Sequence, residues 1–355
     1  MTEGNPADPF AIPVFTAGGV VITVAQVVDA AQCRGELQPF LDEVRLLQRC
    51  SARAQEAELW SDDARLQEIA DTFRYERDLI TAEEAERWFA ARGLTTDDFS
   101  EHVLRWYWKE RLAGSLPAED APHSAADETR ELLRVELLLG GGFETLAVAS
   151  SWRLAAWCAA GRERRGDLLA QELERFLQRE KIDRESLPQW LAVRAIDGRW
   201  LDLILEVEGI FRHARAALAT PVEEKRALNA LRMGLTQFDV ETIQFDTESA
   251  AREALLCVTV DGSSMEEVAQ TGGYPSQRRQ LGASELPAEL QARFLGVAPG
   301  GLIEPFEQGG QFHLCRVIEK KEPDLNEPRV RRAVEDHLTT THFSDLSRLH
   351  VRWLF

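Results

Sequence analysis

The stretch from Phe238 to Lys321 constrains the fold most, because it begins and ends with strand patterns and carries helix patterns between them. FDVETIQF (238 to 245) alternates large apolar and polar side chains, which is typical of a half-buried strand. A helix is expected next, capped by Asp246 or Thr247 and ended at Asp261-Gly262. A second short helix, SMEEVAQ, precedes a glycine-containing loop, and GGQFHLCRVIEKK predicts a returning hairpin strand. This order predicts a small α+β domain with an antiparallel sheet.

The second half of this stretch contains a leucine-glycine after a polar loop, an ELPAEL helix start, a PGGLIEPF turn into a strand and the strand GGQFHLCRVIEKK, in that order. This succession resembles the parvulin (rotamase) family of peptidyl-prolyl isomerases. Parvulins end a corresponding segment in a glycine-aromatic-histidine strand, and Gln311, Phe312 and His313 take those places. The resemblance covers about a quarter of the chain, and it depends on spacing more than on any single residue.

The resemblance implies a site made of two facing histidines, a nearby Cys or Asp, and an apolar proline pocket. Thr242 stands where the first histidine is expected, and the Cys or Asp position falls in the loop near Gly272. His313 is therefore the single candidate catalytic residue, and a strand histidine satisfied by local hydrogen bonds is the favoured alternative. The peptide-binding candidates implied by the resemblance are Thr242, Leu286, Phe294, Leu302 and Phe312.

The first 116 residues are helical in pattern after a short apolar run, Val20 to Val24. Ser61 is a candidate N-cap, Thr81 opens a capping box with Glu84, and Thr95 or Thr96 caps a further helix. This succession resembles the N-terminal helical domain of chaperones of the SurA type, which carry parvulin domains. In such chaperones the C-terminal segment returns to the N-terminal domain, so residues 20–24 are expected to pair with residues 351–355.

A shift of 102 residues places RWFAARGLTTDDF (87 to 99) on QWLAVRAIDGRWL (189 to 201). Residues 127–230 are therefore interpreted as a second helical unit that is a decayed repeat, with chance similarity of amphipathic helices as the alternative. The Pro- and acid-rich segment 117–128 marks a linker. The expected domains are residues 1–116, 127–230, 236–322 (parvulin-like) and a C-terminal helix and strand at 323–355. The predicted fold class is α+β, mostly helical.

Composition excludes several function classes. The chain has 355 residues with 41 basic and 60 acidic side chains, a net charge of −19, which disfavours nucleic acid and anionic membranes as partners. Five scattered cysteines and the absence of a signal-peptide pattern predict a reduced, cytoplasmic protein. Nucleotide-binding and hydrolase motifs are absent, and the seven histidines lack metal-ligand spacing, so we expect no cofactor and no metal.

Two functions remain open. The first is a chaperone-like protein that binds an unfolded or precursor peptide and whose rotamase site has lost its paired residues. A peptide-modifying enzyme is a further candidate partner of such a protein. The second is a working prolyl isomerase in which His313 and a pocket of Phe294, Leu302 and Phe312 suffice. The nine tryptophans and sixteen phenylalanines could also supply an aromatic peptide groove, although packing between helices is the favoured role for most of them.

Overall fold

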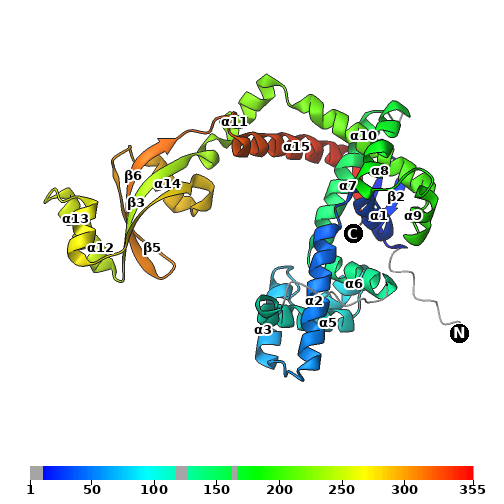
Figure 1. Cartoon of the computed structure of the whole chain (residues 1–355), viewed down its shortest axis with the longest axis horizontal. Helices are drawn as coiled ribbons and strands as arrows, with labels where there is room; N and C mark the ends of the chain where they lie inside the picture. The colour runs from blue at the N-terminus through cyan, green and yellow to red at the C-terminus, as the bar shows by residue number, and fades with distance from the viewer. Residues whose placement is uncertain (1–10, 117–125, 162–165, 355) are drawn as a thin grey trace. The chain divides into compact units, whose positions relative to one another are not determined.

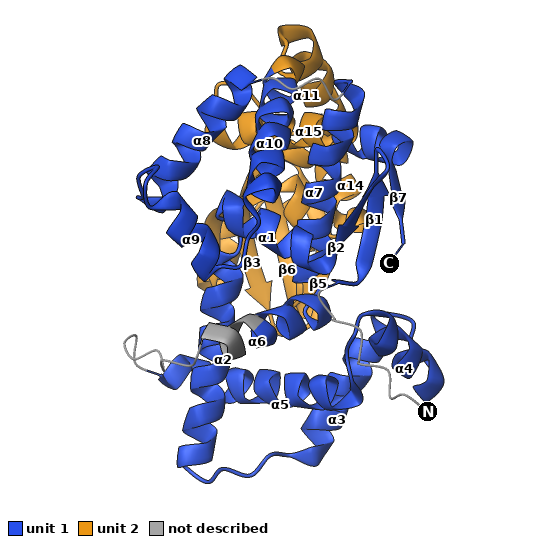
Figure 2. Ribbon diagram, turned by 90° about the vertical axis from the view of Figure 1, so that its right-hand side faces the viewer, with its two compact units in different colours: residues 1–216, 342–355 blue, residues 217–341 orange. Residues whose placement is uncertain are grey.

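A computed structural model describes residues 11–116, 126–161 and 166–354 of the chain (Figure 1). Most of the predicted linker at 117–128 lies outside these residues, as does Phe355. The predicted α+β class is confirmed, since the described residues form a mostly helical chain with two small antiparallel sheets. The chain divides into two compact units, residues 1–216 with 342–355 and residues 217–341 (Figure 2).

The elements of the first half of the chain are β1 (Pro13–Ala17), β2 (Val20–Thr23), α1 (Val24–Arg34), α2 (Gln38–Glu56), α3 (Asp63–Tyr75), α4 (Ala82–Ala91), α5 (Thr96–Leu112), η2 (Ala113–Ser115), α6 (Ala126–Leu139), α7 (Gly142–Ala159) and α8 (Gly166–Glu180). Those of the second half are α9 (Leu187–Val193), α10 (Gly198–Leu218), α11 (Pro221–Leu235), β3 (Gln237–Phe245), α12 (Glu248–Thr259), α13 (Met265–Gly272), β4 (Ser276–Gly282), η3 (Ala283–Glu285), α14 (Ala288–Gly296), β5 (Leu302–Gln308), β6 (Gln311–Lys321), α15 (Pro328–His350) and β7 (Val351–Trp353).

Side-chain caps explain where several helices begin. The capping box of Thr81 with Glu84 is confirmed, and Thr95 forms the same arrangement with Asp98. The cap of α3 is Asp62 and not the predicted Ser61, because the Asp62 carboxylate accepts from the backbone N–H groups of the first turn. Carboxylates are the stronger acceptors there, since the helix N-terminus carries partial positive charge.

The N-terminal sheet has the strand order β2-β1-β7. The predicted strand at 20–24 is confirmed as β2, but its predicted pairing with the C-terminus is wrong. β7 pairs antiparallel with β1, with Phe15 opposite Trp353. The reason is the Gly18-Gly19 turn, in which both glycines have positive φ and fold β1 back onto β2. β1 therefore occupies the central position, and its free edge takes the C-terminal strand.

The two segments related by the 102-residue shift share their local geometry. In α4 the Arg92 guanidinium lies 3.9 Å from the Trp88 ring centroid, and in α9 the Arg194 guanidinium lies 4.1 Å from that of Trp190. Each helix is followed by a residue with positive φ, Gly93 at 62° and Ala195 at 53°. The same ring contact and the same left-handed ending at matched positions are what an internal duplication predicts.

Unit 2 is built around a four-stranded antiparallel sheet in the order β4-β3-β6-β5. Its two faces bury separate apolar clusters. One cluster joins the sheet to η3 and α14 through Leu286, Leu290 and Phe294. The other joins the sheet to α12 and α13 through residues such as Ala254 and Met265. Any site on this sheet therefore belongs to one of two faces, and the alternation of side chains along β3 and β6 decides which.

Candidate functional site

On the two central strands of unit 2, Thr242, which stands where the first histidine is expected, lies beside a buried cysteine. Thr242 on β3 lies opposite Cys315 on β6, and the Thr242 hydroxyl is 3.3 Å from the Cys315 sulfur. Both residues are 0% exposed. Burial raises the pKa of the Cys315 thiol, although the Thr242 hydroxyl and the charges of Arg279 and Arg293 oppose the shift. The thiol is therefore neutral near pH 7 and acts as a packed hydrogen-bonding group.

His313 lies on β6 two residues before Cys315, and it pairs with Phe306 of β5. Its ring is stacked on the Phe306 ring at a centroid distance of 5.6 Å, and the residue is only 5% exposed. Nε2 donates to the backbone carbonyl of Gln308 at 3.2 Å. Nδ1 is buried and has no hydrogen-bond partner among the described residues. The local hydrogen bond predicted for this histidine is thus present, and it leaves one ring nitrogen unpaired.

The apolar residues expected to form a peptide pocket are divided between the two faces of the sheet. Leu286 and Phe294 belong to the cluster under α14, on the face that also carries Thr242 and His313. Leu302 and Phe312 pack instead against the cluster under α12 and α13. The predicted single pocket of Phe294, Leu302 and Phe312 is therefore not formed. Phe312 precedes His313 by one residue, and a shift of one residue in a strand sends a side chain to the opposite face.

The face with Thr242 and His313 contains apolar residues that the sequence interpretation missed. Leu281, Leu290 and Phe306 complete the cluster around Phe294. Leu290 precedes Phe294 by one turn of α14, so helical spacing was a signal that could have found it. Phe294 is 0% exposed, and Leu286 and Leu290 are also buried. These side chains fill a closed core in the described structure, where a proline ring would need an open pocket.

Unit 1 contains aromatic residues that are candidates for the wall of a peptide groove. Tyr107 and Trp108 are buried, so packing is their role, as was favoured for most aromatics. The residue that the sequence interpretation missed is Trp60, which follows α2 and is 92% exposed. Leu59 beside it, Tyr75 and Ile80 are also exposed. Of these four, Leu59 and Trp60 are neighbours in the chain and together offer an apolar surface to other molecules.

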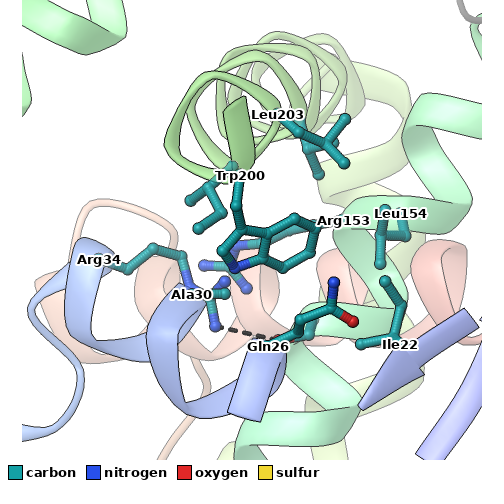
Figure 3. A pocket seen from close by; sticks show the side chains of 11 residues that line it. Ile22, Gln26, Ala30, Arg34, Arg153, Leu154, Trp200 and Leu203 are labelled. Atoms are coloured by element: carbon teal, nitrogen blue, oxygen red, sulfur yellow. Dashed lines mark hydrogen bonds between the residues drawn. The ribbon is translucent and has the colours of Figure 1, made fainter. Parts of the chain in front are cut away.

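A small cavity lies inside the same unit between α1, α7 and α10 (Figure 3). Its volume is about 20 Å³, which suits one water molecule and excludes a peptide. Arg34 lies at its edge and donates to the Ser150 hydroxyl at 3.2 Å. The Trp200 ring nitrogen, which faces the same space, has no partner among the described residues. The cavity is suited to a structural water and not to a ligand.

A buried ionic cluster connects α5 to α6. The Glu136 carboxylate accepts from His102 Nδ1 at 2.7 Å, from Arg105 Nε at 2.7 Å and from Trp106 Nε1 at 3.2 Å. Burial by itself would raise the pKa of Glu136, but the hydrogen bonds and charges of His102 and Arg105 outweigh burial and hold the pKa below its usual range. Both oxygens of the Glu136 carboxylate accept hydrogen bonds, so this buried cluster has a structural role.

Comparisons with solved structures find parvulin-type foldases and chaperones. A peptidylprolyl isomerase (PrsA) from Bacillus cereus is 14% identical, with 66% of this chain and 89% of that chain covered at a TM-score of 0.37. PrsA from Bacillus anthracis is 12% identical, with 56% and 91% covered at a TM-score of 0.29. A SurA-like chaperone of Campylobacter jejuni is 10% identical, with 64% and 92% covered at a TM-score of 0.22. PrsA peptidylprolyl isomerases and SurA-like chaperones are thus among the solved structures that this chain is similar to.

No protein-family model and no curated protein matches the chain. Within the described residues, no helix combines the length and apolar character needed to cross a bilayer. The functional argument therefore rests on the residues of this chain.

Proposed function

We propose that this protein is a peptide-binding chaperone of the parvulin and SurA type whose rotamase site is degenerate. Its role is to hold an unfolded or precursor peptide during maturation, beside a peptide-modifying enzyme. The observation that carries the proposal is the buried pair of Thr242 and Cys315 at the centre of the sheet. A threonine and a neutral thiol stand there, with no second imidazole to face His313.

The chemistry of prolyl isomerisation explains why this pair matters. The barrier to rotation about a prolyl amide is about 20 kcal/mol, and a rotamase lowers it by binding the twisted amide better than the planar one. Such binding requires contact between the peptide and the polar groups of the site. Thr242 and Phe294 have no exposed surface, so a bound proline could not reach them without unpacking the sheet from α14.

Peptide binding is supported by exposed apolar side chains of unit 1. Leu59 and Trp60 lie side by side in the connection between α2 and α3. Apolar side chains at such positions can contact unfolded segments without a specific sequence, as a chaperone requires. All five cysteines are free in the described structure, which accords with the cytoplasmic location that we include in the proposal.

A protease-coupled cis/trans assay on a short proline peptide tests the catalytic part of the proposal. We expect the full chain to leave the isomerisation rate at background. His313→Ala should then change nothing, and His342→Ala, an exposed histidine on α15, is the matched control.

The second candidate is an active prolyl isomerase. It is favoured by one observation, the unpaired Nδ1 of the buried His313. If this candidate is right, the chain accelerates isomerisation, His313→Ala abolishes the acceleration, and His342→Ala leaves it intact. That combination would refute the proposal.

A further inference from the structure

A groove opens on unit 1 between the C-terminal part of α2, the loop that joins α2 to α3, and α5. Its volume is about 940 Å³, within the range of sites that hold small ligands or several peptide side chains. α5 packs against both α2 and α3 at this end of the unit (Figure 2). The large apolar residues that line the groove are Leu59, Trp60, Leu104, Trp108 and Leu132.

Trp60 is held in place although its side chain is exposed. On one side of it the Leu59 N–H donates to the Ala54 carbonyl at 2.9 Å, which closes the end of α2. On the other side the Asp62 N–H donates to the Tyr107 hydroxyl at 3.1 Å, and the Asp62 carboxylate caps α3. Because the backbone is fixed on both sides, no loop has to become ordered when this indole contacts a client, and only the side-chain torsions lose freedom.

The groove also offers polar groups to a polypeptide. Gln55 lines the groove and is exposed. Its side-chain amide can donate to a backbone carbonyl of a bound segment and accept from a backbone N–H. A groove with an accessible amide and an aromatic wall is suited to polypeptide more than to a purely apolar ligand.

The charge at the rim favours a cationic partner. Arg105 reaches the groove, but its Nε donates to Glu136 and its Nη1 to Glu101, so its charge is neutralised. Glu58 at the rim is exposed and has no ion pair within the described residues. An unpaired carboxylate beside exposed apolar side chains complements a basic residue next to an aromatic or aliphatic one. The net charge of −19 attracts such segments at longer range.

From these contacts we propose that the Trp60 groove binds client segments in which a large apolar side chain adjoins a lysine or arginine. The inference rests on the proposed peptide-binding function and names where, and to which chemistry, the client binds. The apolar side chain packs on Trp60 and Leu104, the basic group lies near Glu58, and the client backbone pairs with the Gln55 amide.

Fluorescence anisotropy with two labelled synthetic peptides tests the proposal on the full chain. One peptide alternates leucine and tryptophan with lysine, and the other carries glutamate in place of each lysine. We expect the lysine peptide to bind about tenfold more tightly at low salt, and the difference to shrink as salt is added. Trp60→Ala should weaken binding of the lysine peptide by about tenfold or more, since aromatic anchors dominate such contacts.

Two further variants make the test specific. Tyr75→Ala removes an aromatic side chain that is 67% exposed and does not line the groove, and it should change affinity by less than about twofold. Glu58→Lys should reduce or reverse the preference between the two peptides. Far-UV circular dichroism is expected to be unchanged for each variant, because all three side chains are exposed.

Several results would overturn the proposal. Equal affinity of wild type and Trp60→Ala for the lysine peptide would place the client elsewhere while leaving the proposed function intact. Tighter binding of the glutamate peptide would contradict the assigned charge. Self-association of the wild type that Trp60→Ala abolishes would assign the groove to a second copy of the chain. If the wild type binds neither peptide, the proposed function fails together with the inference.

Discussion

Replacement of Glu136 by glutamine should destabilise unit 1 by about 3 kcal/mol. The carboxylate is buried and accepts three hydrogen bonds, two of them from His102 and Arg105. Glutamine keeps one acceptor oxygen but presents an amide N–H₂ to the remaining donors. Hydrogen bonds to charged groups contribute about 1.5–3 kcal/mol each, and removal of one partner of a buried pair costs about 3–5 kcal/mol. Arg105 also pairs with Glu101, which keeps the expected loss at the lower end.

Urea unfolding of the full chain, followed by far-UV circular dichroism, measures this change in the free energy of unfolding. Glu110→Gln is the matched control, since Glu110 lies on α5, the helix of His102 and Arg105, and pairs with Arg65 at an exposed site. We expect it to cost less than about 1 kcal/mol. Equal losses in the two variants, or a loss below about 1 kcal/mol for Glu136→Gln, would refute the argument that the buried cluster stabilises the unit.

The pH dependence of the same variant follows from the lowered pKa of Glu136. A carboxyl group whose pKa is lower in the folded state contributes stability above its unfolded-state pKa and loses it as pH falls through its folded-state pKa. The difference in stability between wild type and Glu136→Gln should therefore be largest near neutral pH and shrink on acidification. A difference that grows on acidification would contradict this assignment.

Three further predictions concern separate parts of the chain. Gly93→Ala should lower the free energy of unfolding by about 1 kcal/mol, because only glycine adopts positive φ without strain. Ala195→Gly, at the matched position with positive φ, should leave the stability unchanged or raise it slightly. Calorimetry would measure both variants, and equal losses of stability would contradict the shared geometry. Thr242→His should destabilise unit 2 by about 1–3 kcal/mol, because the larger side chain overpacks a fully buried position. It should produce no isomerase activity, and Thr242→Ser is the control that keeps the hydroxyl. Measurable activity would show that the sheet face under α14 can open to a peptide. Burial raises the pKa of the Cys315 thiol, and it raises the pKa of the Cys33 thiol to about 12. Both should resist labelling by a thiol reagent at pH 8 until the chain is unfolded, and fast labelling of either in the native protein would contradict its burial.

The strands and helices of unit 2 could be predicted from the sequence because their signals are local. The alternation in FDVETIQF and in the returning strand depends only on neighbouring residues. The same holds in unit 1 for the capping box at Thr81 and the cap at Thr95. The hairpin of β1 and β2 had a local signal too, the Gly18-Gly19 pair between apolar runs, although Pro13 to Ala17 was not predicted as a strand.

The candidate sites depend on tertiary structure, and this limited their prediction. Which face of the sheet receives Phe312 or Leu302 follows from strand register, and register is set by pairing with distant strands. Trp60 could not be told from a core tryptophan, since its exposure results from how α5 packs against α2 and α3. Composition alone favours burial for such a residue.

The central claim, binding without isomerisation, can be tested in one experiment by exchange NMR spectroscopy. A peptide with a leucine-proline bond and flanking lysines is mixed with the full chain, and cis and trans resonances of the peptide are followed together. We predict that the peptide resonances shift and broaden on binding, while exchange cross-peaks between cis and trans forms stay absent. Cross-peaks that appear with the wild type and vanish with His313→Ala would contradict the account.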